Sequence, residues 1–238
     1  MAQEIVALDG KALRRALRRG QAPRYIVSAW AQGNGLVLGQ FKVAEKSNEI
    51  TALPQLLRVL ELAGCIVTID AMGCQKTIAK EIIEADADYV LALKGNQETV
   101  HAEVQSYLDD AILQQTQTRK AKAKPEPELA HTETVEKDHG RFEIRRYYLS
   151  RLAVDVGQFA RAVRGHWGVE NSLHWCLDVQ MGEDQSRART GHAAENLATL
   201  RRLALNLLKR DKTQKRGLKG KQLNAGWDHA HLLRLLAS

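Results

Sequence analysis

The chain has 238 residues, which is enough for one large domain or two small ones, and 44% of them are hydrophobic. Lys and Arg number 35 against 28 Asp and Glu, and the resulting net charge of +7 favours an anionic partner such as nucleic acid. There is no apolar run of about 18 residues, which excludes a membrane-spanning helix. Residues 1–10 lack a basic segment followed by an apolar stretch, so no secretory signal is expected. Three scattered cysteines are too few for a disulfide framework or a metal clip.

Apolar runs alternate with amphipathic ones in the first half of the chain. The runs predict strands at 4–9, 24–31, 35–43, 65–70 and 88–94, and helices at 48–62, 75–85 and 97–114. The resulting order β-β-β-α-β-α-β-α predicts an α/β fold in which helices cover a mixed sheet.

The second half has a different pattern. Residues 116–138 are polar and charged, which predicts a solvated loop or the remnant of an insertion. One strand is expected at 141–149, and helices at about 155–177 and 193–210. The basic stretch that follows residue 210 is expected to be exposed.

Two aspartates occupy equivalent places in this predicted sheet. Asp9 ends the first strand and Asp70 ends the fourth, and each precedes a small residue or a turn. Open α/β sheets build their sites at the carboxyl ends of strands. If the two strands are neighbours, the carboxylates repel each other, and a cation or a proton has to relieve the repulsion. The alternative is that each aspartate only caps the turn that follows it.

Glu170 is a third acidic residue in an unusual setting. Helical spacing places it on the apolar face of the 155–177 helix, where a buried carboxylate needs a partner. His166 and His174 stand one turn away on either side and could bind a metal, contact a substrate or form local hydrogen bonds. Three acids from two strand ends and a helix suit Mg²⁺ or Mn²⁺, and a pair of such ions is typical of nucleases and polynucleotidyl transferases.

Several sequence blocks carry a family resemblance. In chain order they are LDGKALR, EKSNEITALPQLL, TIDAMGCQKTIAKEI, DYVLALKGNQ, EKDHGR, RYYLS and RGHWGVENSLHWCLDVQMGED. Together they resemble the DDE transposases, and most closely the bacterial insertion-sequence transposases of the H-repeat-associated (ISAs-type) family. The resemblance implies an RNase H-like fold, with a mixed five-stranded sheet flanked by helices and a helical C-terminal part. It also implies that Asp9, Asp70 and Glu170 are the catalytic, metal-binding triad, with two Mg²⁺ or Mn²⁺ ions as cofactor.

The same resemblance implies an activity and partners. The protein would hydrolyse phosphodiester bonds at transposon ends and transfer the ends to target DNA. It would act on double-stranded DNA in the cytoplasm, at the nucleoid and without a membrane. A homodimer in a synaptic complex is the assembly that the resemblance implies. Family members have a segment before the first aspartate and a longer stretch between the HGR and RYYLS blocks, so we expect a shortened copy whose activity truncation could impair. Two alternatives stay open: a non-catalytic DNA-binding transposase remnant, and an RNase H-like nuclease.

These expectations divide the chain into four parts. Residues 1–115 would form the first part of the catalytic core, and 116–150 a polar insertion remnant with a connecting strand. Residues 151–210 would form the helical part that carries the catalytic glutamate, and 211–238 a basic tail with a short terminal helix.

Basic, polar and aromatic residues close to these blocks are candidate DNA contacts. The candidates are Lys11, Arg14, Arg15, Lys94, Asn96, His166, Trp167, Asn171 and His174. Two further basic clusters, at 119–124 and 209–221, could bind phosphate groups or simply face solvent. Trp167 and Trp175 could stack on unpaired bases, although packing in the core is favoured. Related transposases often have Arg and Lys where this chain has His166 and Leu177, which removes a fixed phosphate-binding charge.

Overall fold

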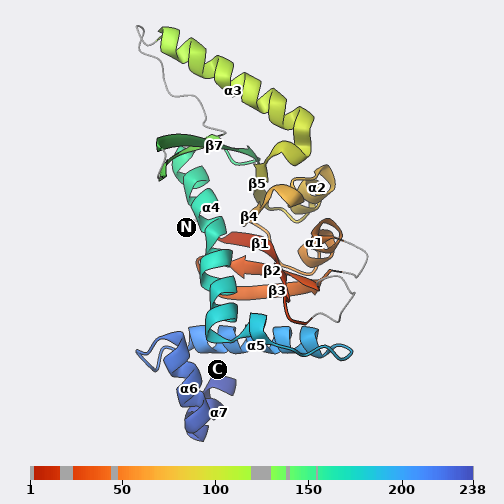
Figure 1. Ribbon diagram of the computed structural model, residues 1–238, viewed down its shortest axis with the longest axis vertical. Helices are drawn as coiled ribbons and strands as arrows, with labels where there is room; N and C mark the ends of the chain where they lie inside the picture. Colours follow the sequence, from red (N-terminus) through yellow and green to blue (C-terminus); the bar gives the residue numbers. More distant parts are fainter. Residues whose placement is uncertain are drawn as a thin grey trace.

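Figure 1 shows the computed structural model of the chain, which describes residues 3–16, 24–43, 48–118, 130–137, 140–153 and 155–237. For residues 110–118, 130–137 and 140–144 it describes the backbone and not the side chains. No helix in these described ranges is long and apolar enough to cross a membrane.

The described strands form one seven-stranded sheet in the order β3-β2-β1-β4-β5-β7-β6. The strands are β1 (Ile5–Ala12), β2 (Tyr25–Ala31), β3 (Leu36–Lys42), β4 (Ile66–Ile69), β5 (Asp88–Leu93), β6 (Ala130–Lys137) and β7 (Gly140–Ser150). β1, β4 and β5 run parallel, whereas β2, β3, β7 and β6 each pair antiparallel with their neighbours. The mixed sheet is therefore parallel at its centre.

Helices cover both faces of this sheet (Figure 1). They are α1 (Glu49–Leu57), α2 (Lys76–Glu84), α3 (Glu98–Thr118), α4 (Val156–Gly168), α5 (Ala193–Arg210), α6 (Leu218–Trp227) and α7 (His229–Leu236). Side chains alternate across a strand. In β1, Val6 and Leu8 join the core cluster beneath α1 and α2, whereas Ile5 and Ala7 join the clusters beneath α4 and the residues that follow it.

α4 does not end at Gly168 but runs on through two π-helical turns, η3 (Val169–His174) and η4 (Cys176–Gln180). Gly168 lets this long helix lie close to the sheet. A Cβ atom added there would lie 1.7 Å from Gln32 Oε1, so a larger residue would push the helix or Gln32 away.

The architecture confirms the predicted α/β, RNase H-like mixed sheet flanked by helices with a helical C-terminal part. The first five predicted strands are β1 to β5, and the strand expected at 141–149 is β7. β7 and β6 extend the sheet beyond β5 as an antiparallel hairpin, so the sheet has seven strands and not five.

One local prediction was wrong. Residues 130–137 form strand β6 and not a loop, because their backbone pairs with β7 along its whole length. After residue 210 the chain forms a second helix, α6, in addition to the expected short terminal helix, α7. Lys221 Nζ donates hydrogen bonds to the carbonyl oxygens of Leu208 and Asp211 at 3.2 and 2.5 Å, which ties α6 to the end of α5.

Candidate active site

The register of the central strands brings Asp9 and Asp70 to one place. β1 and β4 pair in parallel up to Leu8 and Ile69, so the two aspartates follow at the same level of neighbouring strands. Strand alternation puts Asp9 on the same face as Ala7, the face that α4 and η3 cover. The sequence placed Asp9 at the end of its strand, but β1 continues to Ala12 by pairing with β2 alone.

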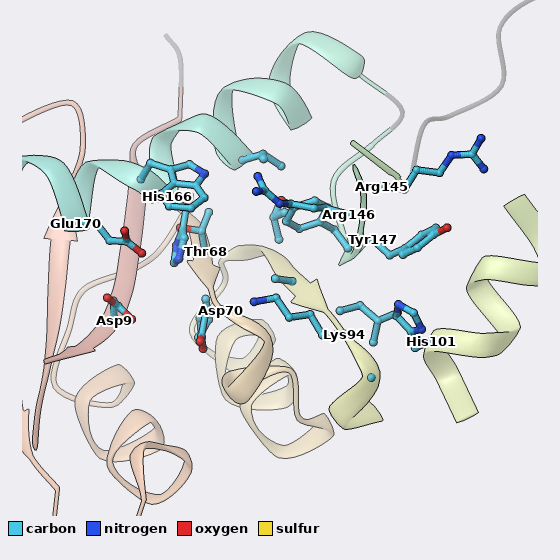
Figure 2. A pocket seen from close by; sticks show the side chains of 18 residues that line it. Asp9, Thr68, Asp70, Lys94, His101, Arg145, Arg146, Tyr147, His166 and Glu170 are labelled. Atoms are coloured by element: carbon cyan, nitrogen blue, oxygen red, sulfur yellow. The ribbon is translucent and has the colours of Figure 1, made fainter. Parts of the chain in front are cut away.

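Asp9, Asp70 and Glu170 line one pocket of about 420 Å³. Figure 2 shows the three carboxylates at the same end of this pocket, with Glu170 reaching in from η3 and the aspartates from the sheet. Burial and the neighbouring charge of Asp70 raise the pKa of Asp9 to about 7, and the charges of Glu49 and Glu170 add to the effect. The site therefore holds more negative charge than its surroundings balance.

Asp70 also serves as a local cap. Its Oδ1 accepts a hydrogen bond of 3.1 Å from the backbone N–H of Met72, at the start of the short 3-10 helix η1 (Ala71–Gly73). The capping alternative and the pocket position are thus compatible, because one carboxylate oxygen makes the cap and no described residue donates a hydrogen bond to the other.

Glu170 is not buried, contrary to the prediction from helical spacing. The π-helical turns widen the helix from Val169 onward, and Glu170 is the second residue of η3. The periodicity of 3.6 residues therefore no longer fixes which face a residue occupies. Val169 and Leu173 take the buried positions, and Glu170 is exposed at the rim of the pocket.

Glu49 is a fourth carboxylate that the sequence reasoning missed. It stands in the first turn of α1, and burial and the charge of Asp70 raise its pKa. Acidic residues are common in first turns because they complement the helix dipole, so the sequence alone did not distinguish Glu49 from an ordinary surface residue.

The two histidines are held uncharged beside the carboxylates. His166 Nδ1 lies 3.0 Å from Thr68 Oγ1, and burial lowers the pKa of His166. His174 Nδ1 lies 3.4 Å from Asp9 Oδ2, but burial lowers the pKa of His174 to about 3, so this contact is not a salt bridge at neutral pH. Neither histidine supplies the positive charge that the carboxylates lack.

Basic and aromatic groups line the other end of the pocket. Lys94, which follows β5, Arg146 from β7 and Trp167 from α4 belong to this part of the lining. His166 does not, because Figure 2 shows it among the carboxylates. The Arg146 guanidinium lies 5.6 Å from the centroid of the Trp167 ring, and Trp167 is 42% exposed. The interpretation of Trp167 as a core residue was therefore wrong. Arg146 was not among the predicted contacts, although it opens the RYYLS block, because the alternating pattern of 141–149 indicated only a strand.

Lys11 has a different environment from the one predicted. It belongs to β1 and is buried, with Nζ at 2.6 Å from Asp178 Oδ1, 2.9 Å from Asp184 Oδ1 and 3.6 Å from Glu183 Oε2. Burial alone would lower the Lys11 pKa, but the hydrogen bonds to Asp178 and Asp184 raise it. We therefore withdraw Lys11 from the DNA contacts: its ammonium group is enclosed by carboxylates.

The remaining candidates lie around the pocket or apart from it. Arg14 and Arg15 are exposed in a turn after β1 and do not line the pocket. Asn96 donates a hydrogen bond of 2.7 Å to the carbonyl of Ala71 and so braces the turn behind Asp70. Asn171 is exposed next to Glu170, and Trp175 is 51% exposed away from the core. The basic cluster at 119–124 lies outside the described residues.

The donor set of the pocket suits a hard divalent cation, since Asp9, Asp70 and Glu170 offer carboxylate oxygens and no lysine or arginine of the described residues forms an ion pair with them. Among the described side chains, no three histidines, cysteines or acids yet form a ready-made metal site. A cation would therefore have to draw the carboxylates together.

Comparisons with known proteins agree with this geometry. A family model described as "Transposase DDE domain" matches residues 2–207. The chain is 38% identical over 273 residues to "Putative transposase YncI" of Escherichia coli O157:H7, with 99% of this chain and 69% of that protein covered. It is 36% identical over 284 residues to "H repeat-associated putative transposase YhhI" of Escherichia coli K12, with 99% and 72% covered.

Proposed function

Because the chain belongs to the family of transposases with a DDE domain, we propose that it cuts and joins DNA by metal-dependent phosphoryl transfer at Asp9, Asp70 and Glu170. One observation carries the proposal: these three carboxylates, from two neighbouring parallel strands and from the helix that crosses them, line one pocket. The raised pKa of Asp9 supports it, because a cation is the partner that would relieve the repulsion.

Two divalent ions, when bound, supply the charge that stabilises the attacking and leaving oxygens of an in-line phosphoryl transfer. Asp9 and Asp70 would hold one Mg²⁺ or Mn²⁺ ion, and Asp9 and Glu170 the second. The cap that Asp70 makes with Met72 fixes its orientation, and the contact with His174 does the same for Asp9.

The opposite end of the pocket is suited to the DNA backbone. Lys94 and Arg146 offer cationic groups to phosphate oxygens, which position DNA without reading its sequence. Trp167 presents part of its ring at the same place and could stack on an unpaired base. His166 and His174 are neutral, so they neither repel a cation nor compete with it for the carboxylates. Asn171 is exposed next to Glu170 and could contact the same DNA backbone.

The partners follow from this reaction. The substrate would be double-stranded DNA, as transposon ends and as target, and a homodimer in a synaptic complex would hold two ends together. Such a reaction belongs in the bacterial cytoplasm, at the nucleoid.

Cleavage of DNA that carries the terminal repeats flanking the gene tests this function. We expect strand cleavage that requires Mg²⁺ or Mn²⁺ and is lost in Glu170→Gln. Glu98→Gln is the control, because Glu98 is an exposed helix residue outside the pocket. Cleavage that persists in Glu170→Gln would contradict the proposal.

The same assay separates the two alternatives. An RNase H-like nuclease would cut without terminal repeats. A non-catalytic remnant would bind DNA and melt cooperatively, yet would show no turnover with any divalent cation.

A further inference from the structure

Glu49 approaches the carboxylate site from the face of the sheet opposite to Glu170. It begins α1, which contacts β2 and β3, whereas Glu170 comes from the helix on the other face (Figure 1). Its carboxylate lies directly over Gly10, the residue after Asp9. A Cβ atom added to Gly10 would lie 2.0 Å from Glu49 Oε1 and 2.7 Å from Oε2. The carboxylate therefore fills the space in which any other side chain at position 10 would begin.

No partner among the described residues explains this position. Within that part of the chain, no hydrogen bond or ion pair involves the Glu49 carboxylate, although the side chain is half-buried. The charges that act on it come from acids, because Glu49 and Asp70 repel each other and Glu49 also raises the pKa of Asp9. A carboxylate held against two others without a cation is unfavourable unless the site binds one.

We propose that Glu49 is a fourth carboxylate of the divalent-metal site, contributing an oxygen donor to the ion that Asp9 and Asp70 hold. The proposal rests on the proposed function, since it assigns one more ligand to the same site. Gly10 then has a definite role. The absence of a side chain after Asp9 leaves the space through which the Glu49 carboxylate reaches the ion.

Metal binding without DNA tests this role directly. In titration calorimetry with Mn²⁺, Glu49→Gln should weaken binding by about 10- to 100-fold, the loss typical of a residue that supports a metal site. Glu98→Gln is a matched control, because Glu98 also stands in the first turn of its helix but is exposed away from the carboxylates. Both variants lose the same helix-dipole interaction, so a difference between them reports the metal site.

Melting in EDTA gives a second readout. Glu49→Gln should melt at or above the parent temperature, because the change relieves repulsion in the empty site. Glu98→Gln should melt at or slightly below it. Equal Mn²⁺ affinity of the two variants would overturn the proposal.

Gly10→Ala fills the space that the Glu49 carboxylate occupies, but it changes none of the four acidic residues. The methyl group meets the far end of a flexible side chain, so the Glu49 carboxylate can swing away without disturbing the backbone. We expect Mn²⁺ affinity to fall as in Glu49→Gln, and the double variant to bind no more weakly than Glu49→Gln alone. Independent, additive losses would overturn the proposal.

Asp70→Asn distinguishes a failure of this inference from a failure of the proposed function. If Asp70→Asn weakens Mn²⁺ binding and Glu49→Gln does not, only the fourth carboxylate is refuted. If the parent binds no Mn²⁺, or Asp70→Asn binds it as the parent does, the metal-dependent function fails, and the role of Glu49 fails with it.

Discussion

Ionisation of Asp9 should destabilise the folded, metal-free protein. Its pKa rises from 3.8 to about 7 on folding through burial and the charge of Asp70, so between these values the folded state keeps a proton that the unfolded state has lost. Stability then falls as pH rises from about 4 to 7, by about 4 kcal/mol at most. Asp9→Asn has no carboxyl group to ionise at this position, so this pH-dependent loss of stability should disappear in the variant.

Melting of the metal-free protein in EDTA measures this effect. The difference in Tm between Asp9→Asn and the parent should grow as pH rises from 4.5 to 7.5. His174 is present in both proteins, so its own titration largely cancels in the difference. A difference independent of pH would show that Asp9 ionises normally in the folded state.

The capping role and the metal-binding role of Asp70 should be separable by mutation. Asparagine keeps an oxygen for the N–H of Met72 and is itself a good cap, so Asp70→Asn should fold normally and melt in EDTA at or slightly above the parent temperature. Mg²⁺ should raise the Tm of the parent more than that of the variant, because a ligand stabilises only the state that binds it. If the variant instead unfolds, Asp70 is chiefly a cap.

At the scale of single residues, the sequence predicted the aspartates of the site but not which other charged side chains lie close to them. Asp9 and Asp70 were found because each follows an apolar strand, and the structure places them at the same level of paired strands. Glu49 was missed because its proximity arises from the packing of α1 over Gly10. Lys11 was misassigned because no local pattern reveals that Asp178 and Asp184, from a distant segment, surround it.

Among the elements, the helix that starts with α4 decides how the site is assembled. Its existence was predicted from the apolar spacing of 155–177, but its π-helical turns were not, because that spacing assumes 3.6 residues per turn. The same turns carry Glu170 to the pocket rim and present Asp178 to Lys11. Strand β1 and this helix are thus joined by an ion cluster two residues beyond Asp9.

The Lys11 cluster should therefore act as a structural link. Lys11→Met leaves the carboxylates of Asp178, Glu183 and Asp184 with one cation fewer, and breaking a buried ion pair in this way costs about 3–5 kcal/mol. Arg14→Met is the control, because Arg14 is 77% exposed and its contact with Asp184 is worth about 1 kcal/mol or less. Urea unfolding of both variants measures the difference. Equal losses would show that Arg202, which pairs with Glu183 at 2.8 Å, suffices as the counter-ion.

For the molecule as a whole, net charge overstates the cationic surface. Several lysines of the predicted basic clusters have protein partners. Lys209 lies 4.6 Å from the centroid of the Trp30 ring, Lys219 donates to the carbonyl of Gln180, and Lys221 ties α6 to α5. The sequence could count these charges but could not show which of them the fold uses, since that depends on how α6 returns to α5.

Lys94, by contrast, is exposed beside the carboxylate pocket, where a DNA backbone would have to pass. Binding of duplex DNA should weaken with salt, with log K falling by about 0.9 per unit of log salt for each phosphate contacted. Lys94→Gln should make that slope shallower by about one phosphate contact. Lys80→Gln should leave it unchanged, because Lys80 is an exposed lysine of α2 paired with Glu84 at 3.6 Å, on the opposite face of the sheet from α4. Filter binding over a range of salt concentrations, in EDTA to prevent cleavage, measures both slopes. Equal slopes for the two variants would remove Lys94 from the DNA contacts, and a flat salt dependence of the parent would show that phosphate contacts contribute little anywhere on the molecule.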